Sequence, residues 1–191
     1  MLDTELTSLE HRTNRLLSVG AIAMQGTSIL LGEQFYRVAN PEVEIPGDSV
    51  VIHQLRSEDV ANAEQISKTL EELRLFIRGA VLVGHFTHID LKILRKELAR
   101  GGRTLENLAL DTARAHQWLL RHGSKAEDIT LQLEKLDLES VVKAYGFDPG
   151  HAHHALGDAF LTAQLWQKML IRLQKIGVKN LRGLLKIAAS K

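Results

Sequence analysis

The sequence predicts an α/β fold in which a mixed β-sheet, made of an antiparallel hairpin and parallel strands, is flanked by α-helices. Three runs rich in strand-forming residues come first, at 2–6, 15–24 and 27–38. The second and third are separated by the short polar link Gln25-Gly26, which is typical of a hairpin turn. Beyond them, short apolar runs alternate with segments of helical period, an order that places helices against a sheet.

The later elements are predicted from periodicity and from residues that begin or end helices. Ile66 to Ile77 repeats apolar residues at helical spacing. Gly101-Gly102 should end the helix that starts at His88, and Asp137 should cap a helix of its own. In order, we expect a loop through Asn40-Pro41 and Pro46-Gly47, a short helix from Ser57, helix 66–77, strand 80–83, helix 88–100, strand 108–110, helix 112–121, helix 138–145 and helix 154–173. The two later strands should be parallel partners beside the first strand.

The composition is that of a globular protein. The 191 residues include 45% apolar and 25% charged residues, with a net charge of +1, values that are ordinary for soluble domains. The absence of cysteine excludes disulfides, thiolate nucleophiles and cysteine-rich zinc sites. The first residues do not resemble a signal peptide, and no apolar run approaches the roughly 18 residues of a membrane span. We therefore expect a cytoplasmic protein without membrane contact.

Basic residues gather at the C-terminal end. The last 33 residues carry seven basic residues and no acidic one, which leaves 17 basic against 23 acidic residues in the rest. Such an end could meet a phosphate backbone or an acidic partner, or form a solvated helix face. Apolar and basic residues alternate over 176–191, so we predict a small amphipathic helix that packs on the main domain, residues 1–175.

Asp3 and Glu5 are the first candidate site residues. Side chains alternate along a strand, so the two carboxylates should point to the same side about 7 Å apart. Like charges placed in this way repel each other unless a cation lies between them. A solvated surface pair is the alternative interpretation, and the metal hypothesis depends on further carboxylates downstream.

Two further carboxylates follow in suitable settings. Asp90 comes after a buried strand, in the first turn of a helix, and shares its helix face with Ile93 and Leu94. Asp158 lies in the longest helix among small residues that let another element approach, just after a run of histidines. Alone, each has an ordinary explanation, as an acid at a helix N-terminus or as part of a histidine-rich surface loop.

Together these residues predict metal-assisted hydrolysis of a phosphodiester. Four carboxylates with a nearby histidine and no cysteine match hard cations such as Mg²⁺ or Mn²⁺. Two such ions about 3.5–4 Å apart can activate a water and stabilise the leaving oxygen. A histidine that titrates near neutrality can take the proton from that water.

Three ordered motifs resemble those of the DnaQ-like DEDDh 3′–5′ exonucleases, a family of ribonuclease H-like fold that includes the polymerase III epsilon subunit and ribonuclease T. Residues 3–9, D-T-E-L-T-S-L, are similar to the first motif, D-T-E-T-T-G-L. Residues 84–90, G-H-F-T-H-I-D, resemble the second, H-N-x-x-F-D. Residues 153–159, H-H-A-L-G-D-A, resemble the third, H-x-A-L-x-D-A, and the similarity runs from Asp3 to about Leu173.

The resemblance implies a two-metal site. Asp3 would bridge both ions, Glu5 and Asp158 would help hold the ion that carries the attacking water, and Asp90 would hold the ion beside the leaving group. His153 would be the general base. The next residue is also a histidine, at the position where a sister subfamily has its tyrosine, and we prefer His153 because no tyrosine is present there.

The departures from the family pattern fall on the surface that would grip the terminal nucleotide. The expected substrate-binding residues are Thr4, Leu6, His53, His85 and Phe86. Leu6 and Ser8 replace a threonine and a glycine, Phe86 replaces an asparagine, and Ile89 a phenylalanine. The stretch from His53 resembles the family's H-G-I-T loop without its glycine. These changes should affect substrate preference and turnover more than the chemistry.

The first strand has few residues ahead of the site. Only Met1 and Leu2 precede Asp3, whereas members of the family have several apolar residues there. A shortened strand loses ladder hydrogen bonds and buried apolar area, so we expect weakened stability and looser metal binding.

The sequence therefore predicts a 3′–5′ exonuclease with two divalent ions, Mg²⁺ or Mn²⁺, that releases nucleoside monophosphates from single-stranded 3′ ends. DNA is the favoured substrate and RNA the alternative, because no residue is identified that would contact a 2′-hydroxyl. A DNA polymerase or another replication or repair protein is the expected protein partner. The rival hypothesis is a weakly active or inactive module of this fold that binds nucleic acid or such a partner. The intact set of four carboxylates and His153 favours the enzyme.

Overall fold

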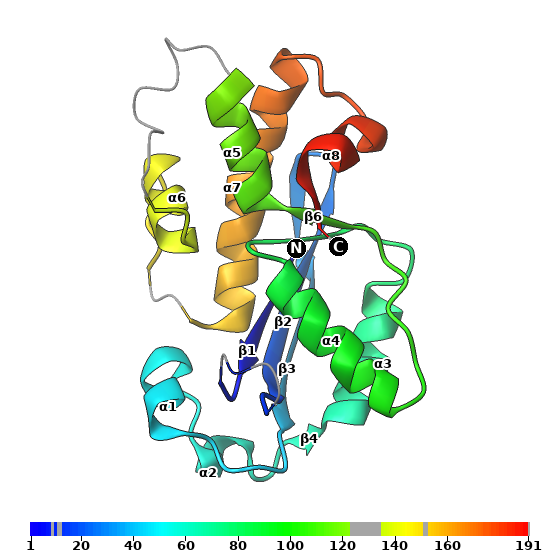
Figure 1. Ribbon diagram of the computed structural model, residues 1–191, viewed down its shortest axis with the longest axis vertical. Helices are drawn as coiled ribbons and strands as arrows, with labels where there is room; N and C mark the ends of the chain where they lie inside the picture. Colours follow the sequence, from blue (N-terminus) through cyan, green and yellow to red (C-terminus); the bar gives the residue numbers. More distant parts are fainter. Residues whose placement is uncertain (9, 11–12, 123–134, 151–152, 191) are drawn as a thin grey trace.

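A central group of strands separates two groups of helices in the computed structural model, which describes residues 1–8, 10, 13–122, 135–150 and 153–190 (Figure 1). On one side lie α3 (Ile66–Phe76) and α4 (His88–Arg100), and on the other lie α5 (Thr112–His122), α6 (Leu138–Ala144) and α7 (Ala155–Lys175). The predicted α/β architecture is confirmed.

The larger hydrogen-bonded sheet has the strand order β1-β2-β3-β4. β1 (Leu2–Leu6), β2 (Leu16–Gln25) and β3 (Ser28–Asn40) are antiparallel neighbours, and the two-residue β4 (Glu64–Gln65) joins β3 in parallel. The predicted hairpin is confirmed: its turn contains Gly26 at φ +58°, a conformation that favours a residue without a Cβ.

A second ladder has the order β5-β6-β7. β5 (Leu82–Gly84) and β6 (Ala109–Asp111) are parallel, as predicted, and β7 (Ala189–Ser190) pairs antiparallel with β6. The sequence predicted one continuous sheet, whereas the ladders among the described residues form two. β5 nevertheless lies against β1. A Cβ added to Gly84 in β5 would be only 3.0 Å from the carbonyl oxygen of Leu2 in β1.

The two faces of the first sheet bury apolar side chains against different helices. One cluster joins β1, β2 and β3 to α3 and α4, with Leu16, Leu70 and Leu94 among its members. A smaller cluster joins Ile22 of β2 to Ala159 and Ala163 of α7. This burial stabilises α4 and α7 on opposite faces of the strands.

One helix was missed by the sequence analysis. α1 (Gly47–His53) occupies part of the chain that was expected to be a loop. Its run Val50-Val51-Ile52 is β-branched, which lowers helix propensity and hides the signal. The short helix α2 (Ser57–Val60) is confirmed, and the ends of the other elements predicted before residue 176 agree with the observed ones to within two residues. The helix predicted over 176–191 is shorter, at 181–188. Near the C-terminus, α8 (Leu181–Ala188) contacts α5 and β6.

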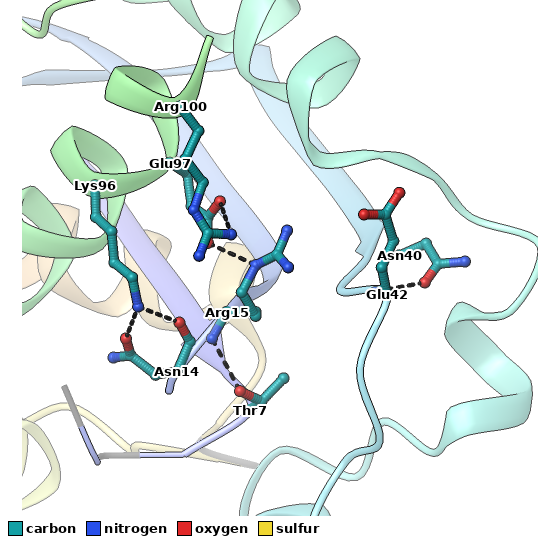
Figure 2. A network of polar contacts seen from close by, with 8 residues as sticks. All are labelled: Thr7, Asn14, Arg15, Asn40, Glu42, Lys96, Glu97 and Arg100. Carbon is teal, nitrogen blue, oxygen red and sulfur yellow. Dashed lines mark hydrogen bonds and ion pairs between the residues drawn. The ribbon is translucent and has the colours of Figure 1, made fainter. Parts of the chain in front are cut away.

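A buried ion pair fixes α4 to the start of β2 (Figure 2). Arg15 Nε lies 2.8 Å from Glu97 Oε1, and Arg100 contacts the other carboxylate oxygen at 3.3 Å. The Glu97 side chain is only 2% exposed. Beside this pair, Lys96 Nζ donates to the backbone and side-chain oxygens of Asn14. These contacts hold α4, which carries one candidate metal ligand, against the start of β2, the neighbour of the strand β1 that carries two.

We predict that Glu97→Gln lowers the free energy of unfolding by about 3 kcal/mol, because Arg15 would keep its charge with little water around it. Urea unfolding measures this loss. Glu72→Gln is the matched control: Glu72 pairs with Arg37 at the same 2.8 Å distance, but both side chains are well exposed. This control should lose less than about 1 kcal/mol, and equal losses in the two variants would contradict the role given to burial.

Candidate active site

Asp3 and Glu5 lie on the same face of β1, as strand alternation requires. In the β1–β2 ladder Asp3 is opposite Gly20 and Glu5 is opposite Ser18. The alternate residue Leu2 belongs to the core cluster with α3 and α4. The two carboxylates therefore point away from that core.

Gly20 allows the N-terminal end of α7 to lie directly on β2. A Cβ at Gly20 would come within 2.2 Å of the backbone nitrogen of Leu156, a distance that no side chain tolerates. This close approach brings Asp158, near the start of α7, to the carboxylates of β1. One oxygen from each of Asp3, Glu5 and Asp158 lies within 4.8 Å of the others.

The Asp158 carboxylate is held at one oxygen only. Its Oδ2 accepts a hydrogen bond from the backbone N–H of His153 at 2.8 Å. Its Oδ1 is buried and has no hydrogen-bond partner among the described residues. Leaving a buried acceptor unsatisfied is costly, so this oxygen is available to a cation in the space that Asp3 and Glu5 share with it.

Asp90 joins the group from the first turn of α4. It is 4% exposed, and its Oδ1 accepts a hydrogen bond from Thr4 Oγ1 at 2.7 Å. Thr4 stands between Asp3 and Glu5 in β1, so this bond links the helix to the strand at the site itself. The negative charge of Asp90 contributes to the raised pKa of both acids of β1. The four carboxylates therefore act as one electrostatic group.

All four carboxyl groups have raised pKa values, with burial as the main cause in each. The pKa of Glu5 is raised to about 8, with further contributions from the charges of Asp158 and Asp90. The pKa of Asp90 is raised to about 7, and the pKa values of Asp3 and Asp158 are raised as well. A bound cation would reverse this effect, because it stabilises the ionised carboxylates.

The site residues surround a cavity of about 460 Å³ between β1, α1, α4 and the starts of α6 and α7. Its lining includes every residue that the sequence predicted: Asp3, Thr4, Glu5, Leu6, His53, His85, Phe86, Asp90, His153 and Asp158. Residues from both ends of the chain are therefore brought to one place. Leu9, the last residue of the first motif, lies outside the described residues.

The two adjacent histidines occupy different positions. His153 lines the cavity and has φ +71°, in the left-handed region that few residues other than glycine adopt. His154 is the N-cap of α7: its Nδ1 accepts from the backbone N–H of Gly157 at 3.3 Å, and its ring stacks on Tyr36. His153 is thus the member of the pair that lines the cavity.

His53 and His85 are both buried, but they differ in hydrogen-bonding capacity. His53 Nδ1 accepts from the backbone N–H of Leu55 at 3.1 Å, and its Nε2 has no partner among the described residues. Both ring nitrogens of His85 contact protein atoms. Therefore His53 has a nitrogen left for a ligand, whereas His85 has none.

Phe86 adopts a backbone conformation that is unusual for a bulky residue. Its φ is +52°, in the left-handed region, and its ring contacts the edge of His85 at 4.7 Å between ring centres. Asparagine, which the second motif of the DnaQ-like exonucleases has at this position, adopts the left-handed conformation more readily. Phenylalanine here therefore places backbone strain at the wall of the cavity.

Several cavity residues were not selected by the sequence analysis. Asp48 and Ser49 reach the cavity from α1, the helix that was missed. Asp137 also lines it, although it was predicted only as the cap of α6, a role in which it accepts from the N–H of Ser140. The capping pattern could have drawn attention to Asp137, whereas nothing in the sequence places α1 beside β1.

Comparisons with known proteins show the family of the chain. The profile of the RNase T family, described as exonuclease, matches residues 1–166. The DNA polymerase III epsilon subunit of Aquifex aeolicus is 24% identical over 193 residues, which cover all of this chain and 90% of that protein. The PolC-type DNA polymerase III of Caldanaerobacter subterraneus is 28% identical over 180 residues, or 94% of this chain and 12% of that protein.

Solved structures show the same fold. Exonuclease X in complex with 5′ overhanging duplex DNA has a TM-score of 0.71 and 17% identity, and the match covers 97% of this chain and 96% of that one. E. coli exonuclease I in complex with a dT13 oligonucleotide has a TM-score of 0.80 and 16% identity, covering 97% of this chain and 44% of that one.

The fold and the family profile define the class: the chain belongs to the RNase T/DnaQ-like exonuclease family. This family is metal-dependent in its typical members, and the acidic cluster of Asp3, Glu5 and Asp158 is present here. The chain spans about an eighth of the length of the PolC-type polymerases that it matches. Among the described residues, no helix has both the length and the apolar character needed to cross a membrane.

We predict that Gly20→Ala lowers the free energy of unfolding by about 1–3 kcal/mol, because its Cβ would push the start of α7 away from β2. Gly32→Ala is the control, since Gly32 is also in a strand and a Cβ there would meet nothing within 4 Å. The control should stay within about 0.5 kcal/mol of the parent. Equal unfolding midpoints for the two variants would show that α7 does not depend on the missing Cβ.

We predict that Glu5→Gln makes the metal-free protein more stable at pH 8.5. A carboxyl group with a raised folded pKa contributes stability below its unfolded pKa of about 4 and loses it as the pH rises through the folded value, which for Glu5 is about 8. The buried N-terminal ammonium, whose pKa burial lowers to about 6, changes in the opposite sense but is common to both proteins.

The measurement is thermal unfolding in EDTA at pH 6.5 and pH 8.5, on either side of the folded pKa of Glu5. The advantage of Glu5→Gln over the parent should grow by about 3 °C or more between the two pH values. An advantage that stays constant with pH would contradict the raised pKa.

Proposed function

We propose that this chain is a DEDDh-type 3′–5′ exonuclease that uses two divalent ions, Mg²⁺ or Mn²⁺, to hydrolyse single-stranded nucleic acid. The observation that carries the proposal is the group of four carboxylates around one cavity, with a buried oxygen of Asp158 that has no hydrogen-bond partner among the described residues. Membership of the exonuclease family supports it.

The residues fit such ions in chemistry as well as in position. The donors are carboxylate oxygens, which Mg²⁺ and Mn²⁺ prefer. Asp3, Glu5 and Asp158 would hold one ion, and Asp3 with Asp90 would hold the second. Bound ions supply a nucleophilic water at neutral pH and stabilise the charge on the leaving oxygen. Thr4 keeps the Asp90 carboxylate oriented through its hydrogen bond.

His153 is the proposed general base. It faces the cavity one hydrogen bond from the cluster, because its backbone N–H donates to Asp158. A neutral imidazole at this place can accept a proton from the attacking water. Its neighbour His154 is engaged in capping α7 and stacking on Tyr36, which supports the choice between the two.

His53 is the proposed contact to the substrate phosphate. Its Nδ1 accepts from a backbone N–H, so the proton of the neutral ring must be on Nε2. Burial lowers the pKa of His53, with the charge of His153 adding to the effect, and this favours the neutral ring. A buried N–H at the cavity wall that has no acceptor among the described residues suits a phosphate oxygen.

Single-stranded DNA is the proposed substrate, released as nucleoside monophosphates, with RNA as the alternative. Exonuclease I and exonuclease X of the same fold are described with DNA. The similarity to polymerase III subunits also suggests a DNA polymerase as the protein partner. Leu6 and Phe86, which line the cavity where the family has other residues, should tune the preference between substrates.

We predict a metal-dependent ladder that shortens from the 3′ end of a 5′-labelled single strand, measured for DNA and for RNA in Mn²⁺, Mg²⁺ and EDTA. Asp158→Asn should lose more activity than the roughly 10–100-fold that loss of an outer-shell partner causes. Glu72→Gln, on an exposed ion pair, is the control that should keep full activity. Intact label in every condition with a folded protein would instead favour a binding module of this fold.

A further inference from the structure

His85 joins three segments that meet at the cavity. It follows β5 and is 8% exposed. Its Nδ1 lies 2.8 Å from the hydroxyl of Thr112 at the start of α5, and its Nε2 lies 2.6 Å from the carbonyl oxygen of Leu136. The second contact spans 51 residues of sequence. Among the described residues, no other histidine of the cavity wall contacts two distant parts of the chain through its two ring nitrogens.

The direction of each hydrogen bond follows from the chemistry of the partners. A carbonyl oxygen only accepts, so Nε2 of His85 must carry a proton and donate to Leu136. Burial lowers the pKa of His85, which favours the neutral ring. In the neutral ring Nδ1 then accepts the hydroxyl proton of Thr112 at 2.8 Å, in competition with the longer contact of that hydroxyl with the carbonyl oxygen of Gly84 at 3.2 Å. Both contacts are satisfied by this single tautomer.

The contact with Leu136 lies beside the cavity wall formed by α6. The next two residues, Asp137 and Leu138, line the cavity. Asp137 also starts α6, because its side chain accepts from Ser140 N and its carbonyl accepts from Val141 N. Whatever fixes Leu136 therefore fixes the first turn of α6 at the site.

The far end of α6 is held by other contacts. Tyr145, which follows α6, approaches His116 of α5 through its hydroxyl at 3.3 Å, and its carbonyl accepts from Lys168 of α7. These bonds stabilise the helix away from the cavity. Beside the apolar cluster that contains Val83 and Val141, the hydrogen bond from His85 Nε2 is thus the polar contact that ties the cavity end of α6 to the end of β5.

We propose that His85 is a positioning residue that holds the first turn of α6 against the cavity and so sets the affinity for substrate, without taking part in bond cleavage. For its kinetic readout the proposal rests on the exonuclease function above. A direct contact between His85 and substrate is disfavoured because both nitrogens are already bonded inside the protein.

Two conservative variants separate the two hydrogen bonds. The amide of glutamine can take the place of Nε2 and keep the bond to Leu136, whereas the shorter asparagine can take the place of Nδ1 and keep only the bond to Thr112. His85→Asn should raise KM up to about tenfold, the factor for one lost hydrogen bond of about 1.4 kcal/mol. Its kcat should stay within about twofold. His85→Gln should stay near the parent in both.

His116→Phe is the matched control. His116 is also a buried histidine that joins α5 to the α6 region, but it does not line the cavity. It should lower the unfolding midpoint and leave KM unchanged. A merely structural role of His85 would give His85→Asn the same behaviour as this control, and that result would overturn the proposal.

Amide hydrogen exchange gives a readout that does not need activity. The N–H groups of Ser140 and Val141 in the first turn of α6 should exchange faster in His85→Asn and at the parent rate in His85→Gln. Equal protection in all three proteins would overturn the positioning role, as would a fall in kcat at unchanged KM. If the parent cleaves no substrate, the proposed exonuclease function fails, and the exchange rates alone decide the role of His85.

Discussion

The approach of α7 to β2 at Gly20 is the contact on which the site depends. Only a residue without a Cβ lets the backbone of Leu156 lie this close to the strand. Gly20 is opposite Asp3 in the ladder, so the approach also brings Asp158 into the group formed by Asp3 and Glu5. The packing of α7 on β2 thereby gathers three carboxylates, and their negative charge, in one place.

That concentration opposes folding, and the surrounding contacts offset it. Burial and mutual repulsion raise the pKa values of the cavity carboxyl groups, so without a cation they resist ionisation at neutral pH. The bond from Thr4 to Asp90 holds α4 against β1 despite this repulsion. The buried pair of Arg15 and Glu97 holds it against the start of β2 (Figure 2). A divalent cation would turn the same repulsion into attraction, which links metal binding to the stability of the whole fold.

Much of the fold and site could be predicted because the signals are local. Strand alternation put Asp3 and Glu5 on one face, and Gly101-Gly102 correctly predicted the end of the helix 88–100. The motif order then brought Asp90, Asp158 and His153 to the same cavity. What could not be predicted depends on tertiary packing. The middle of α1 consists of β-branched residues, which do not predict a helix. The contact of His85 with Leu136 joins segments far apart in sequence.

Isothermal titration with Mn²⁺ at pH 7.5 is the measurement that tests most directly whether these carboxylates act as one metal-binding group. We expect saturable binding accompanied by proton release, because carboxyl groups with raised pKa values must ionise to bind a cation. The release is read by repeating the titration in buffers of different ionisation enthalpy. Asp3→Asn should abolish saturable binding, whereas Glu72→Gln should not change it. Absence of saturable heat in the parent, or equal binding by Asp3→Asn, would show that the four carboxylates do not form one metal-binding group.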